Sequence, residues 1–114
     1  ALIEAQVLAG GFLRIKRLVL EQFREHYPDL WYTEPTTDPE HPEHKFTAFF
    51  AAESFEHRFY GEDHMFSKRM RDMGQQMFIY PNATINHYGI RGWEGNLDSW
   101  LKKKADEERP RASQ

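Results

Sequence analysis

The chain has no cysteine, no long apolar run and no excess of positive charge. Without cysteine it can form neither a disulfide nor a thiolate metal site; this fits a reducing compartment, and we expect a cytoplasmic protein. No apolar segment approaches the roughly 20 residues that span a bilayer. The net charge is -3 and the pI is about 6.1, whereas nucleic-acid-binding domains usually show a basic face or a pI above about 9. These absences disfavour a disulfide scaffold, a membrane span and a nucleic-acid partner.

The residues that are present indicate a packed domain. Of 114 residues, 39% are hydrophobic and 15% are aromatic, with nine phenylalanines. This aromatic share is typical of a folded core rather than a disordered chain. We expect one domain over residues 1–105 and a disordered, charged tail over residues 106–114. Residues 1–8 form an abrupt apolar start, which predicts a piece of a longer protein and a homo-oligomer that uses this exposed segment.

Three helices follow from spacing and end signals. Helical spacing predicts a helix over residues 16–26 that ends before Pro28. A second helix opens with Gly61, Glu62 and Asp63, where acidic residues suit the helix dipole, and ends at Gly74. Its apolar face carries Met65, Phe66, Met70 and Met73. A third helix runs from Asn96 to about residue 105.

The remaining apolar runs read as short strands in a thin sheet. We predict a buried strand over residues 46–52 and a hairpin-like pair over residues 77–80 and 84–88. Residues 33–45 form a proline-rich loop, and residues 53–60 and 89–95 form turns or loops. The fold class is therefore α/β, with α+β as the alternative. The few strands need cover along their edges, which again indicates a missing neighbouring half.

The order of several short motifs carries a resemblance to a known family. The motifs are Gly-Gly-Phe at 10–12, Ile-Lys-Arg at 15–17, Tyr-Pro-Asp-Leu at 27–30, Gly-Glu-Asp-His-x-Phe at 61–66, Tyr-Pro at 80–81, Asn-His-Tyr-Gly at 86–89 and Trp-Glu-Gly-Asn-Leu at 93–97. No single motif is specific, and their order and spacing together are what count. The chain resembles the C-terminal, acceptor-side part of nucleotide-sugar glycosyltransferases of the GT-A fold, including poorly characterised phage- and marine-type members.

The resemblance implies roles for the acidic pair. In that fold a Glu-Asp pair opens a helix beside the acceptor, and one carboxylate is the catalytic base of inverting enzymes. The matching residues are Glu62 and Asp63, of which we favour Asp63. A carboxylate can accept the proton of a sugar hydroxyl, which is a poor nucleophile until it loses that proton. Taken alone, the pair is better explained as an ordinary acidic first turn.

The same resemblance implies a metal and a sugar-binding rim. His87 matches a histidine that helps to hold a divalent ion, Mn²⁺ or Mg²⁺, on the donor diphosphate; imidazole suits manganese better. Gly10 and Gly11 match a glycine turn beside the bound sugars. Trp93 and Glu94 match an acceptor loop in which indole stacks on a sugar ring. The alternatives stay open: a strand-end histidine, an ordinary glycine loop and a core tryptophan.

One departure limits what this chain does alone. The family's Asp-x-Asp motif, which chelates the metal, belongs to the N-terminal half, and the chain contains none. The resemblance therefore implies a fragment that transfers a sugar from a nucleotide-sugar donor to a hydroxyl acceptor only when completed. The alternative is a small stand-alone binding module, such as a winged-helix-like nucleic-acid binder.

Overall fold

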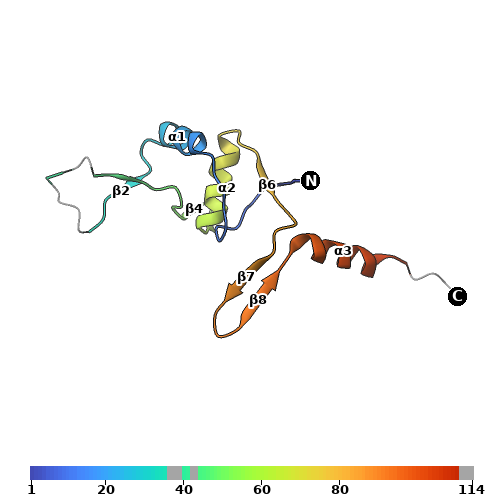
Figure 1. Ribbon diagram of the computed structural model, residues 1–114. Helices are drawn as coiled ribbons and strands as arrows, with labels where there is room; N and C mark the ends of the chain where they lie inside the picture. Colours follow the sequence, from blue (N-terminus) through green and yellow to red (C-terminus); the bar gives the residue numbers. More distant parts are fainter. Residues whose placement is uncertain (36–39, 42–43, 111–114) are drawn as a thin grey trace. The chain divides into compact units, whose positions relative to one another are not determined.

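Residues 1–35, 40–41 and 44–110 are described by the computed structural model, in which they form three helices and eight short strands (Figure 1). The helices are α1 (Arg17–His26), α2 (Glu62–Asp72) and α3 (Leu97–Glu108). The strands are β1 (Ile3–Ala5), β2 (Trp31–Tyr32), β3 (Phe46–Thr47), β4 (Glu53–Phe55), β5 (Arg58–Tyr60), β6 (Met77–Ile79), β7 (Ile85–Tyr88) and β8 (Gly92–Gly95). The fold class is mixed α and β, as the sequence predicts.

The strands pair two by two and do not form the single thin sheet expected from the sequence. In the described ranges β1 pairs with β6, β2 with β3, β4 with β5 and β7 with β8. The last three pairs are antiparallel.

The chain divides into two compact units, residues 4–77 and residues 1–3 with 78–114, and each is described by itself.

Phe23 lies at the centre of the unit of residues 4–77. Its side chain is fully buried, and its ring centroid lies 4.9 Å from that of Tyr27, 5.0 Å from that of Phe49 and 6.4 Å from that of Phe66. Phe66 belongs to α2, so this cluster joins the apolar faces of α1 and α2. α1 and α2 therefore pack together through Phe23 and Phe66.

The predicted apolar face of α2 is also buried. Met65, Phe66 and Met70 are 3% to 6% exposed, and Met73 is partly buried against the same cluster. Met77 at the start of β6 joins them. The helix begins at Glu62 and ends before Gly74, whose φ of 77° lies in the left-handed region that glycine enters without steric cost.

Arg69, in the second half of α2, is a buried cation. Its side chain is 3% exposed, and its guanidinium donates to the carbonyl of Ala51 and to the carboxylate of Glu53, both at 2.8 Å. The hydroxyl of Tyr27 in turn donates to the Arg69 carbonyl at 3.4 Å. Arg69 therefore ties α2 to the segment that leads into β4 and to the end of α1.

Two strand predictions in this unit are wrong. The run 46–52 forms only the two residues of β3, because the chain turns at Phe49 and Phe50 and both rings pack on the α1–α2 cluster. Residues 53–60, expected to be a loop, form the hairpin of β4 and β5. Its two-residue turn places Glu56 and His57 at φ 49° and 62°. Such turns usually carry asparagine or glycine, so the sequence gives no hairpin signal here.

The predicted pairing of 77–80 with 84–88 is wrong as well. Pro81 and Thr84 instead bind the start of α3: the Asn96 side chain donates to Thr84 Oγ1 at 3.0 Å, and the Asp98 amide donates to the Pro81 carbonyl at 2.9 Å. β7 instead pairs with β8, which lies within the segment 89–95 that the sequence indicated was a loop. β8 begins and ends with glycine, which is depleted in strands, so the sequence pattern did not indicate a strand there.

Asn96 caps α3, as predicted. Its side-chain oxygen accepts from the Ser99 amide at 3.1 Å, the usual interaction of an N-cap asparagine. α3 continues to Glu108, so the first residues of the charged tail extend the helix. Over residues 78–110 the only buried residue is Pro81. No described helix has the length and apolar character needed to cross a membrane.

Replacing the buried cation tests the role of Arg69. Arg69→Met keeps the length and apolar stem but leaves the Ala51 carbonyl without its donor, and we expect unfolding to become easier by about 2 kcal/mol. Denaturant unfolding followed by circular dichroism measures this. Arg58→Met on exposed β5 is the matched control and should change stability by less than about 0.5 kcal/mol. Equal effects at the two positions would contradict the assignment.

Candidate functional site

The structure brings together two of the predicted site residues at the start of α2. A Cβ atom added to Gly10 would lie 3.8 Å from the Cβ of Asp63, an ordinary contact distance. Asp63 is half-buried, and its Oδ1 accepts from the His64 amide at 2.8 Å. The segment around Gly10 therefore runs beside Asp63, and a side chain at Gly10 would contact the Cβ of Asp63.

The other two residues predicted in this region are less involved. Glu62 is exposed to solvent, which agrees with the preference for Asp63 within the acidic pair. A Cβ atom added to Gly11 would meet nothing within 4 Å, and neither glycine has a positive φ. Gly11 thus fits an ordinary loop position.

The remaining predicted residues gather on the hairpin of β7 and β8. His87 and Trp93 are directly opposite in register, and Asn86 is opposite Glu94. Directly opposite residues of an antiparallel pair point to the same face, so the imidazole and the indole share one. Trp93 is 64% exposed in this chain.

The two groups belong to different units. Gly10 and Asp63 lie in residues 4–77, whereas His87, Trp93 and Glu94 lie in residues 78–114. The roles that the resemblance implies would require Asp63 and His87 to face one shared groove, and this stays a prediction.

His87, the predicted metal ligand, is not part of a cluster of ligating side chains in the described ranges. Among the described residues no three His, Asp or Glu side chains gather as a metal site. His87 faces Trp93 across the hairpin rather than a carboxylate. The described residues can supply one imidazole ligand and do not by themselves build the donor set that a divalent ion needs.

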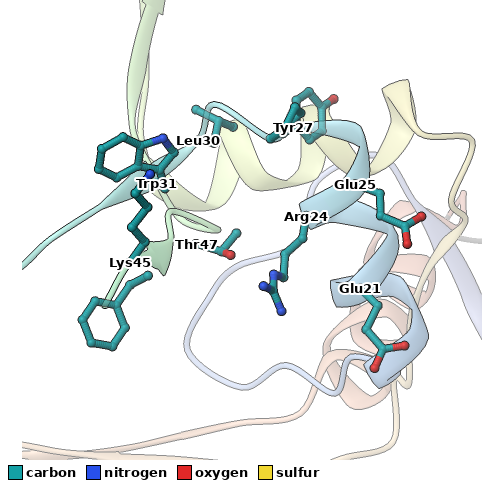
Figure 2. A pocket seen from close by; sticks show the side chains of 10 residues that line it. Glu21, Arg24, Glu25, Tyr27, Leu30, Trp31, Lys45 and Thr47 are labelled. Atoms are coloured by element: carbon teal, nitrogen blue, oxygen red, sulfur yellow. The ribbon is translucent and has the colours of Figure 1, made fainter. Parts of the chain in front are cut away.

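A pocket that the sequence analysis missed lies between α1 and the β2–β3 hairpin (Figure 2). Its volume is about 560 Å³, within the range of small-molecule sites. Charged residues of α1 and Lys45 contribute to its lining, together with aromatic residues that include Trp31. One sequence feature could have indicated this pocket: Trp31 and Tyr32 directly precede a polar, proline-rich segment. Such a segment offers few apolar side chains for these two rings to pack against.

Tyr27, which lines this pocket, and Lys68, which belongs to α2, both have raised pKa values. Burial, and then the negative charge of Asp72, raises the pKa of Tyr27 above its ordinary 10.0, while Arg69 and Lys68 act against this. A hydrogen bond to Asp72, at 2.6 Å, raises the pKa of the half-buried Lys68 above 10.5. Both groups therefore hold their protons more tightly in the folded chain.

Comparison of the chain with protein-family models, curated proteins and solved structures finds no match. The site must therefore be argued from its own geometry.

The raised pKa values of Tyr27 and Lys68 predict a loss of stability at high pH. A group whose pKa is raised on folding contributes its full stabilisation below its unfolded value, and this contribution disappears as the pH rises through the folded value. The free energy of unfolding should fall above pH about 10. For Tyr27→Phe, the free energy of unfolding should fall less steeply, because this variant lacks the titrating hydroxyl. Denaturant unfolding of both proteins at pH 8 to 11 measures the slopes. Parallel slopes would show that Tyr27 titrates alike in both states.

Proposed function

We propose that this chain is the acceptor-side half of a GT-A-like glycosyltransferase and that Asp63 is its catalytic base. The observation that carries the proposal is the position of Gly10 beside the half-buried Asp63. A glycine at this place leaves room for a substrate hydroxyl next to the carboxylate. The three-layer fold of the family would be completed by a neighbouring half that contains the Asp-x-Asp motif.

The state of the Asp63 carboxylate suits a general base. It has no cationic partner among the described residues, and its one hydrogen bond, from the His64 amide, reaches only Oδ1. Oδ2 is therefore available to accept a proton. The base and the attacking hydroxyl must come within about 3 Å, which an acceptor lying over Gly10 would permit.

The β7–β8 hairpin, considered by itself, also carries groups that suit sugar binding. The exposed indole of Trp93 can stack on the apolar face of a sugar ring, and the Glu94 carboxylate can accept hydrogen bonds from sugar hydroxyls. His87 would contribute one nitrogen ligand to a Mn²⁺ or Mg²⁺ ion. The ion would polarise the diphosphate leaving group of the donor, and its other ligands would come from the donor and the completing half.

A nucleic-acid-binding module has less support. Lysines 102, 103 and 104 lie on α3, and each has a carboxylate of the same helix within ion-pair distance, from 2.8 to 4.0 Å. Lys103 and Lys104 share Glu107, so two carboxylates offset part of the charge of the three lysines. The strand pair 77–80 and 84–88, on which a winged-helix reading relied, does not form.

Substitution of the proposed base tests the function. With the complete product of the reading frame, UDP- and GDP-sugars and sugar acceptors, Asp63→Asn should lower kcat by about 10²- to 10⁴-fold. The acceptor KM should change little, because an amide keeps the shape of the side chain and only loses the basic oxygen. Radiolabelled sugar transfer measures both constants.

Glu62→Gln is the matched control for this experiment. It removes a neighbouring exposed carboxylate of the same helix turn and should keep wild-type kcat. Absence of transfer by the wild type from any donor, or full activity of Asp63→Asn, would refute the proposal.

The exposed apolar start of the chain supports self-association. Leu2 is 60% exposed and Val7 is 38% exposed. We propose that residues 1–8 form the contact of a homo-oligomer, whose burial of apolar surface would stabilise it. Light scattering of Leu2→Glu should show a monomer where the wild type is larger. Phe59→Ser, at an equally apolar position that is 76% exposed, is the control and should keep the oligomer.

A further inference from the structure

The hollow between α1 and β3 continues along the helix beyond the pocket already described. A second hollow of about 360 Å³ shares five lining residues with the first: Glu21, Arg24, Lys45, Phe46 and Thr47. We call the two together the α1–β3 pocket. All of its lining belongs to the unit of residues 4–77.

Two cations of this pocket have no carboxylate partner among the described residues. Arg24 comes from the last turn of α1 and Lys45 from the residue before β3, and both line both hollows. Neither takes part in an ion pair, whereas Glu21 is already paired with Arg17 at 2.9 Å. In Figure 2 the Arg24 side chain extends from α1 into the space that faces Thr47, and Glu21 and Glu25 lie on the far side of Arg24 from Lys45. The pocket thus presents two cations without an ion-pair partner, with the Glu25 carboxylate also in its lining.

The rest of the lining offers flat apolar surface and hydroxyl-binding groups. Trp31 is 47% exposed, and the ammonium of Lys45 lies 4.0 Å from the centroid of one of its rings. Phe46 is 45% exposed. Thr47 provides a hydroxyl and Glu25 a carboxylate. This combination fits a ring that has an apolar face, several hydroxyls and one anionic substituent.

We propose that the α1–β3 pocket binds a saccharide that carries an anionic group, a carboxylate or a phosphate. The anion lies between the Arg24 guanidinium and the Lys45 ammonium, where charge-assisted hydrogen bonds are strongest. The sugar ring lies against the exposed aromatic side chains, and its hydroxyls meet Thr47 and Glu25. A neutral sugar would leave both cations without a partner. The choice of a saccharide rests on the proposed transferase function, whereas the pocket and its charged residues do not depend on that function.

Tryptophan fluorescence gives a direct test with the whole chain. In a Trp93→Phe/Trp100→Phe background, Trp31 is the only tryptophan, so its emission reports the pocket alone. The probes are digalacturonate for the carboxylate, glucose 6-phosphate for the phosphate and cellobiose as the neutral sugar. We expect saturable changes with at least one acidic probe and none with cellobiose, and weaker binding at high salt because exposed charges are screened.

Variants of the two cations make the test specific. Arg24→Gln and Lys45→Gln should each weaken binding of the acidic sugar by about tenfold, the usual effect of losing a hydrogen bond to a charged group. Arg58→Gln, which removes an exposed cation outside the pocket, should leave the affinity unchanged. Circular dichroism of each variant checks that the fold is intact.

The other outcomes overturn the proposal. Equal binding of cellobiose, absence of binding by either acidic probe, or an unchanged affinity of both variants would each do so. Tighter binding of uridine monophosphate than of glucose 6-phosphate would assign the pocket to a nucleotide instead. Asp63→Asn separates this inference from the proposed function, because that variant should lose transfer and keep the binding of the acidic sugar.

Discussion

The contact of α1 with α2 through Phe23 is the constraint on which the unit of residues 4–77 depends. One fully buried ring meets Tyr27, Phe49 and Phe66, and the buried core around it is small. The same packing fixes α1 as one wall of the α1–β3 pocket and orients the start of α2, where Asp63 lies. Arg69 reinforces it by tying α2 to the approach to β4. Residues 78–110 contain no comparable cluster.

The helices could be predicted because their signals are local. Apolar spacing, the proline after α1, the acidic start of α2 and Asn96 before α3 each act within one or two helical turns. The strand pairs could not be predicted as well. Pairing depends on which segments meet, and the glycines of β8 and the unusual turn at Glu56 gave no local sign of a hairpin. The interaction of Asn96 with Thr84 joins residues 12 apart in sequence, beyond the reach of any pattern.

The candidate site likewise has one part that local sequence signals predicted and another part that depends on how segments meet. Asp63 could be named from the sequence because its carboxylate opens a recognisable helix, and the opposition of His87 and Trp93 follows from a hairpin that had to be seen first. The α1–β3 pocket was invisible for a different reason. Arg24 looked like one exposed cation of an amphipathic helix, and only folding places Lys45, 21 positions later, along the same hollow.

The tight turn at Glu56 and His57 constrains chain length in its neighbourhood. Side chains alternate along a strand, so one extra residue in this turn would shift the pairing of β4 with β5 by a step and reverse the faces of one strand relative to the other. Keeping both the pairing and the Arg69–Glu53 contact would then require β5 to present its opposite face, although no residue of the core had changed. Insertions and deletions should therefore be selected against at this hairpin, and natural variation should take the form of substitutions, with asparagine or glycine readily accepted at the two turn positions.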